Sequence, residues 1–140
     1  MTPKFRTTGE PEKVEKFRAP PSDGVPVSIT HPVFCLRHLG HDKSFSVEKL
    51  EKKFIVGFVK KLNQLATQSW AEIRGNRKQA NGFELIPKDQ IKGRIPDDFA
   101  YADDFTVFRF SGKKARFAGV TSDSVMHIIW VDGKLALYDH

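Results

Sequence analysis

Hydrophobic residues recur every three to four positions in the stretch SVEKLEKKFIVGFVKKLNQLATQ, which begins at Ser46. This spacing predicts an amphipathic α-helix with Ser46 as its N-cap. The apolar stripe consists of Val47, Leu50, Phe54, Phe58, Leu62 and Leu65. The next stretch, SWAEIRGN, has the capping-box spacing from Ser69 to Glu72 and a glycine stop at Gly75. The pattern therefore predicts two consecutive helices whose lysines lie mostly away from the apolar stripe.

Apolar and polar residues alternate in the C-terminal part of the chain, which predicts strands. Turn sequences at Ser111–Lys114, Thr121–Ser124 and Val131–Lys134 separate these strands, and Asp132-Gly133 is the strongest hairpin signal. We expect a four-stranded antiparallel meander. The face that covers the helices is predicted to carry Phe108, Phe110, Ala115, Phe117, Gly119, Met126, Ile128, Trp130, Leu135 and Leu137.

The remaining segments predict less regular structure. A short strand is expected after Pro32 in HPVFC, and another at FELI, whereas the loop around it is punctuated by glycine and proline. Residues 1–26 are rich in Pro, Thr, Lys and Glu and predict an extended N-terminal arm. A chain of 140 residues supports one core, so residues 27–140 are predicted to form a single α+β domain. In it, two N-terminal helices pack on a C-terminal antiparallel sheet of about four strands.

Charge and cysteine content narrow the possible partners. The formal net charge of +6 and a pI near 9.5 favour an anionic partner. No apolar run is long enough to span a bilayer and the N-terminus lacks the apolar centre of a secretory signal, so we expect a cytoplasmic protein without membrane contact. The single Cys35 excludes an intramolecular disulfide. His31, His38 and His41 fit no zinc spacing, so neither a metal nor another cofactor is expected.

The second face of the predicted meander carries the candidate chemistry. With two-residue turns, Arg109 lies opposite Arg116, Ala118 opposite His127, and His127 opposite Tyr138. Two opposed arginines repel unless an anion or a carboxylate lies between them. Arginine suits phosphate oxygens, histidine exchanges a proton near neutral pH, and tyrosine can donate a hydrogen bond or stack on a base. This face therefore predicts a phosphate site.

A structural interpretation of the same residues stays open. Arg109 and Arg116 would then make an exposed face soluble, or pair with the acids of PDDFAYADD, and His127 and Tyr138 would form an ordinary cross-strand pair.

The order of elements, with the strands TVFRFSGKKARFAGV and VMHIIWVDGKLALYDH after two helices, resembles the RelE/ParE-like toxins of bacterial toxin-antitoxin systems over residues 46–140. The resemblance implies a metal-independent endoribonuclease that cleaves messenger RNA, often on the ribosome, and is silenced by a cognate antitoxin. It matches Arg109 and Arg116 to arginines of two successive strands, and Tyr138 or His140 to the terminal aromatic residue or histidine. His127 and the arm have no fixed counterpart, and some members attack gyrase instead of RNA.

Cleavage of RNA without a metal requires a base for the 2′-hydroxyl proton, cations for the charge on phosphorus and an acid for the leaving oxygen. Arg109 and Arg116 are assigned to the phosphate and transition-state charge. His127 is assigned as base or acid, and Tyr138 as the group that orients the substrate or donates a proton. The residues expected to bind RNA are Lys113, Lys114 and His140.

A protein of another class would use the same basic face differently. In that alternative the chain is a non-catalytic module that binds RNA or an acidic protein and breaks no bond. Electrostatic binding predicts similar losses from any change of a basic residue, whereas catalysis predicts that single changes abolish turnover while binding survives.

Overall fold

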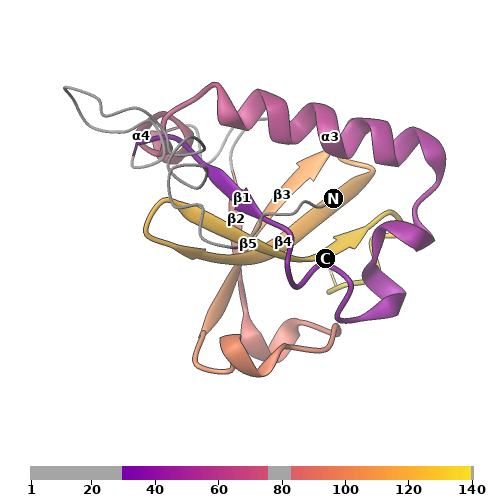
Figure 1. Cartoon of the computed structure of the whole chain (residues 1–140). Helices are drawn as coiled ribbons and strands as arrows, with labels where there is room; N and C mark the ends of the chain where they lie inside the picture. The colour runs from indigo at the N-terminus through magenta and orange to yellow at the C-terminus, as the bar shows by residue number, and fades with distance from the viewer. Residues whose placement is uncertain (1–29, 76–82, 140) are drawn as a thin grey trace, which may run out of the picture.

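The computed structural model describes residues 30–75 and 83–139 and shows an α+β fold, as the sequence predicts (Figure 1). Among these residues the helix α3 lies across one face of a five-stranded sheet with the order β1-β5-β4-β3-β2. Strand β1 runs parallel to β5, and the other neighbours are antiparallel. The elements are β1 (Val33–Cys35), α3 (Lys52–Ala66), α4 (Trp70–Gly75), β2 (Phe83–Pro87), β3 (Asp104–Phe110), β4 (Ala115–Ser122) and β5 (Val125–Asp132). Short 3₁₀ turns are Lys43–Phe45, Val47–Lys49, Lys88–Gln90 and Asp97–Phe99.

The long helix begins later than its sequence pattern predicts. Ser46 does not cap it, because the Ser46 hydroxyl donates a hydrogen bond to the carbonyl of Lys43 at 3.1 Å and the chain forms two 3₁₀ turns there. Leu50 then has an extended backbone, and α3 starts at Lys52 after Glu51 as N-cap. The side chains that α3 buries are Phe54, Phe58, Lys61 and Leu65.

The predicted capping box of the second helix is confirmed. The Ser69 amide donates to Glu72 Oε1 at 2.8 Å, and the Glu72 amide donates to Ser69 Oγ at 3.1 Å. Trp70 and Ile73 of α4 are buried. The Trp70 indole donates to the carbonyl of Ser124 at 2.9 Å and so ties α4 to the turn between β4 and β5.

The predicted short strands are both present as β1 and β2, but the meander differs from the prediction. Its fourth strand is β2, which precedes the others in the chain, and residues 133–139 form no strand. Asp132 explains this ending, since its carboxylate accepts the amides of Lys134 at 3.0 Å and Leu137 at 2.8 Å. These bonds turn the chain, and Leu135 has a left-handed backbone with φ of 57°.

An irregularity between β4 and β5 changes which residues share a face. Ala118 pairs with Trp130 but the next residue, Gly119, pairs with Ile128, so Ile129 is an extra residue on β5. Glycine permits this close approach. A Cβ at Gly119 would collide with the carbonyl oxygen of His127.

Two of the predicted cross-strand pairs are absent, because the turn between β4 and β5 lies at Asp123-Ser124 and residues 133–139 form no strand. His127 lies opposite Val120 instead of Ala118, and Tyr138 is not on a strand that could face His127. Trp130 moves to the face away from α3, and Val131 takes its place toward the helix. The predicted pair of Arg109 and Arg116 is confirmed.

The sheet is covered on both faces, in contrast to the predicted single apolar face. Residues that pack toward the helices include Phe108, Phe110, Phe117, Met126, Ile128 and Val131. A second apolar cluster on the other face contains Phe99, Phe105, Val107, Ala118, Ile129, Trp130, Leu137 and Tyr138. The segment between β2 and β3 and the C-terminal segment supply the cover for this face. No helix within the described ranges is long and apolar enough to cross a membrane.

Candidate anion-binding groove

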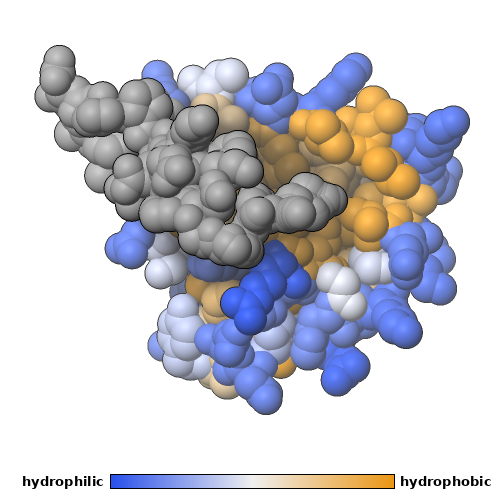
Figure 2. All heavy atoms as spheres, in the orientation of Figure 1, coloured by the Kyte–Doolittle hydropathy of each residue, from blue (hydrophilic) through white to orange (hydrophobic). Residues whose placement is uncertain are grey.

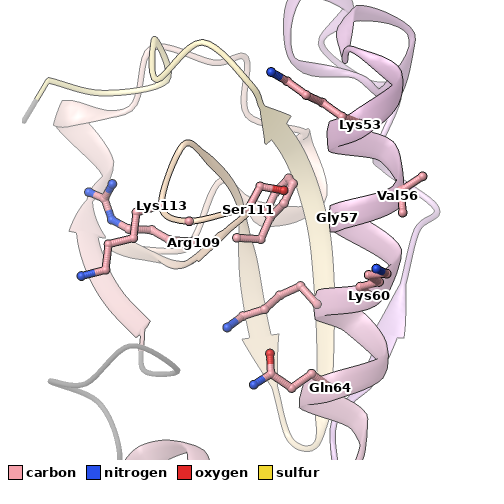
Figure 3. A pocket seen from close by; sticks show the side chains of 11 residues that line it. Lys53, Val56, Gly57, Lys60, Gln64, Arg109, Ser111 and Lys113 are labelled. Carbon is pink, nitrogen blue, oxygen red and sulfur yellow. The ribbon is translucent and has the colours of Figure 1, made fainter.

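A groove with a volume of about 530 Å³ lies between α3 and the hairpin that joins β3 to β4 (Figure 3). Its lining includes five cationic residues and no acidic one. They are Lys53, Lys60 and Lys61 of α3, and Arg109 and Lys113 of the hairpin. Such a concentration of one sign of charge in a concave surface attracts anions. We refer to this surface as the basic groove.

The hairpin comes close to the helix because α3 contains a glycine there. A Cβ at Gly57 would collide with Ser111 Oγ and would lie 3.3 Å from Cδ2 of Phe110. Figure 3 shows Ser111 directed toward Gly57. The hairpin itself is tightly folded, with left-handed φ of 53° at Ser111, 66° at Gly112 and 68° at Lys113. Glycine at position 57 therefore brings the hairpin and the helix together as the two walls of the groove.

Lys61 lies deepest among the lysines of the groove, with only 7% of its surface exposed. It follows Gly57 by one helical turn and occupies the buried stripe of α3 between Phe58 and Leu65. Burial lowers the pKa of its ammonium group because charge is costly away from water. An anion in the groove would offset that cost. The sequence pattern predicts lysines that lie mostly away from the apolar stripe, and Lys61 is an exception, because it lies three residues after Phe58 and four before Leu65.

Arg109 and Lys113 form the rim of the groove. Figure 3 shows their side chains leaving the hairpin next to one another, away from α3. The Arg109 side chain is 24% exposed, and its Nη2 lies 3.5 Å from Oε1 of Glu84 on β2. Lys113 is exposed at the hairpin tip. The rim therefore combines one paired guanidinium with one solvated ammonium group.

Arg116, the second predicted phosphate ligand, is fully buried. Its Nε lies 3.2 Å from Oδ2 of Asp132, and its Nη2 donates to the carbonyl of Tyr138 at 2.8 Å. The guanidinium also stacks on the Tyr138 ring, 3.6 Å from the ring centre. In this conformation Arg116 has no surface to offer an RNA phosphate. Its contacts are those of a residue that holds the C-terminal segment on the sheet.

Tyr138 is buried beside Arg116, with 3% of its surface exposed. Its hydroxyl donates to Glu84 Oε1 at 2.9 Å. Burial raises the pKa of the phenol, and the hydrogen bond to Glu84 raises it further. The carboxylates beside the two arginines are thus Glu84 and Asp132. The structural interpretation expected acidic partners for these arginines, but it expected them in the segment PDDFAYADD.

The remaining predicted residues lie elsewhere or outside the described chain. His127 packs against Phe99, with ring centres 5.2 Å apart. Because it pairs with Val120, it lies four residues along the sheet from Arg116, about 13 Å away. Lys114 is exposed on the hairpin but does not line the groove. His140 lies outside the described residues. The structure therefore brings together Arg109, Arg116 and Tyr138, but not His127.

No cluster of three or more His, Cys, Asp or Glu side chains suited to a metal occurs in residues 30–75 and 83–139. Comparison with protein-family models, with curated proteins and with solved structures finds no match to this chain. The resemblance to RelE/ParE-like toxins thus stays a prediction from the sequence.

Proposed function

We propose that this protein binds RNA, with the phosphate backbone held in the basic groove. The observation that carries the proposal is the lining of five cationic residues and no acidic residue between α3 and the hairpin. Lysine ammonium groups and arginine donors are the usual protein partners of phosphate oxygens. The one aromatic residue of the lining, Phe110, is buried, so it offers no platform for stacking a base. Recognition is therefore expected to depend on the backbone and to vary little with base sequence.

Metal-independent cleavage of messenger RNA, on the ribosome or free, is the activity that the toxin resemblance adds to this proposal. The geometry favours the non-catalytic alternative, because Arg116 and Tyr138 are buried and His127 lies apart from them. Of the four predicted catalytic residues, Arg109 alone both lines the groove and retains partial exposure. Binding of RNA and cleavage of RNA can be measured separately on the same samples.

A protein partner, such as the antitoxin that the resemblance implies, has a suitable surface on α3. Ile55, Val56 and Val59 are 39%, 50% and 58% exposed, and hydrophobic side chains gather over this helix in Figure 2. Lys53 and Lys60 lie on the same helix, so the matching partner is an amphipathic helix with acidic flanks. Val56 also lines the groove, and a partner seated there would obstruct access of RNA.

The test is fluorescence anisotropy of a labelled oligouridylate with the full-length protein in EDTA, followed by gel analysis of the same samples with and without ribosomes. Lys60→Gln and Lys61→Gln are expected to weaken binding, and Lys43→Gln, which removes an exposed charge outside the groove, serves as the control. The affinity should fall as salt rises, and the logarithm of the association constant should decrease with the logarithm of the salt concentration by about 0.7 per phosphate contact. Equal effects of all three changes would reject the groove as the binding site, and fragments in the wild-type lanes would establish cleavage.

A further inference from the structure

The facing arginines of β3 and β4 each form an ion pair with a carboxylate, and the two pairs differ in their exposure to solvent. Asp132 is 3% exposed, and its carboxylate accepts hydrogen bonds from Arg116 and from two backbone amides. Glu84 has a side chain that is 50% exposed and lies 3.5 Å from Arg109. Solvent and ions reach the second pair but not the first. Arg116 is therefore permanently neutralised, whereas Arg109 can exchange its partner.

Glu84 does not depend on Arg109 for its position. The same oxygen, Oε1, accepts the Tyr138 hydroxyl at 2.9 Å, which is a shorter contact than the one to Arg109. Tyr138 is in turn fixed by its stacking on Arg116 and by the hydrogen bond from Arg116 to its carbonyl. A buried tyrosine thus holds a carboxylate beside the one arginine of the groove's rim.

From this arrangement we propose that Glu84 is a built-in competitor for Arg109 and sets how tightly the basic groove binds a phosphate backbone. This inference rests on the proposed function and adds its regulation. A phosphate at the rim, bound by Arg109 and Lys113, competes with the Glu84 carboxylate, because Oε1 of Glu84 already lies 3.5 Å from Nη2 of Arg109 and both groups are anions that favour the same guanidinium. Glu84 weakens RNA binding at this position, and Tyr138 keeps it there.

The test measures oligouridylate binding by anisotropy for the wild type and four variants of the full-length chain. Glu84→Gln is expected to tighten binding about two- to fivefold, the range that corresponds to one exposed ion pair. It should also steepen the dependence of the logarithm of the association constant on the logarithm of the salt concentration by about 0.7, the value for one more phosphate contact. Glu48→Gln is the matched control, since it causes the same change of charge on an exposed residue outside the groove. Arg109→Gln and the double variant Glu84→Gln with Arg109→Gln should bind equally, because Glu84 acts through Arg109.

Each outcome distinguishes the inference from the proposed function. If the wild type binds and Glu84→Gln behaves like Glu48→Gln, the competitor role is rejected while RNA binding stands. If Glu84→Gln still tightens binding in the Arg109→Gln background, the effect is general charge and the inference is also rejected. If neither the wild type nor any variant binds, the proposed function itself fails. Tighter binding that is specific to Glu84 and requires Arg109 supports both.

Discussion

Arg116 and Asp132 lie opposite one another on β4 and β5, with Nε 3.2 Å from Oδ2 and both side chains closed to solvent. The pair exists because the bulge at Ile129 shifts the register of β5 relative to β4. Asp132 uses the same carboxylate to accept the amide of Leu137, so the ion pair also fixes the chain that follows the sheet. One of the two arginines that the sequence assigns to the phosphate is thus a structural residue in the fold.

Asp132→Asn is expected to destabilise the protein by about 3–5 kcal/mol, because it leaves a buried guanidinium without its counter-charge. The free energy of unfolding is measured by urea denaturation. Glu84→Gln breaks the exposed counterpart of this pair and should cost less than about 1 kcal/mol. Similar losses from the two changes would contradict the structural role of Asp132. Because Arg116 is part of this buried pair, an Arg116 variant could lose RNA binding by unfolding, so its stability must be measured together with its binding.

Gly119→Ala tests the bulge that creates this register. The added Cβ would collide with the backbone carbonyl of His127, which cannot move away as a flexible side chain can. We expect a loss of more than about 2 kcal/mol in the free energy of unfolding. Gly40→Ala is the control, since no atom lies within 4 Å of its added Cβ and its φ is not left-handed. A Gly119→Ala protein as stable as Gly40→Ala would mean that β5 can pair with β4 without the bulge.

The elements of this fold were largely readable from local patterns, whereas the candidate site was not. The capping box at Ser69 and the turn at Ser111–Lys114 depend on neighbours in sequence, and both are present. The Arg109–Arg116 pair, which follows from the turn, is present as well. The strand expected after Asp132 failed because a single carboxylate captures two downstream amides, which no hydrophobic alternation reveals. The register predicted for β5 was wrong in part because Ile129 is an extra residue opposite β4, which the alternation of apolar and polar residues does not reveal either.

The basic groove could not be predicted because its walls come from distant segments. Lys61 and Arg109 are separated by almost fifty residues, and their proximity to one cavity depends on the close approach of Ser111 to Gly57. Lys61 stood in the sequence as one lysine on an otherwise apolar stripe. Arg109 and Lys113 were predicted to bind an anion and both line the groove, but no local pattern placed the lysines of α3 beside them.

The pH dependence of stability should report on Tyr138. Its pKa is raised in the folded state, first by burial and then by Glu84, above the value of about 10 for an unfolded chain. The folded state therefore retains the phenol proton where the unfolded state has lost it, so this contribution to stability is complete below about pH 10 and disappears as pH rises through the folded pKa. Urea denaturation between neutral pH and pH 11 should show a steeper decline for the wild type than for Tyr138→Phe. Tyr101→Phe, at a tyrosine that is 68% exposed, should leave the wild-type decline unchanged.

Lys61 is expected to show a conflict between stability and binding. Burial lowers the pKa of its amine, so at neutral pH the folded state contains an ammonium group that is poorly hydrated. Lys61→Met removes this charge and buries an apolar side chain, and we expect it to raise the free energy of unfolding by about 1–2 kcal/mol at pH 7. The gain should shrink as pH rises through the lowered pKa of the folded state and should be gone above the unfolded pKa of about 10.4, where the amine is neutral in both states.

The same variant should bind oligouridylate more weakly than the wild type, which separates a lysine kept for anion binding from one tolerated by the core. Lys60→Met is the comparison, since it changes the neighbouring residue of the groove, which is exposed and has no desolvation cost to relieve. A Lys61→Met protein that is more stable and binds RNA as well as the wild type would remove Lys61 from the site. A protein that is less stable would instead show that the contacts of Lys61 within the fold outweigh the cost of burying its charge.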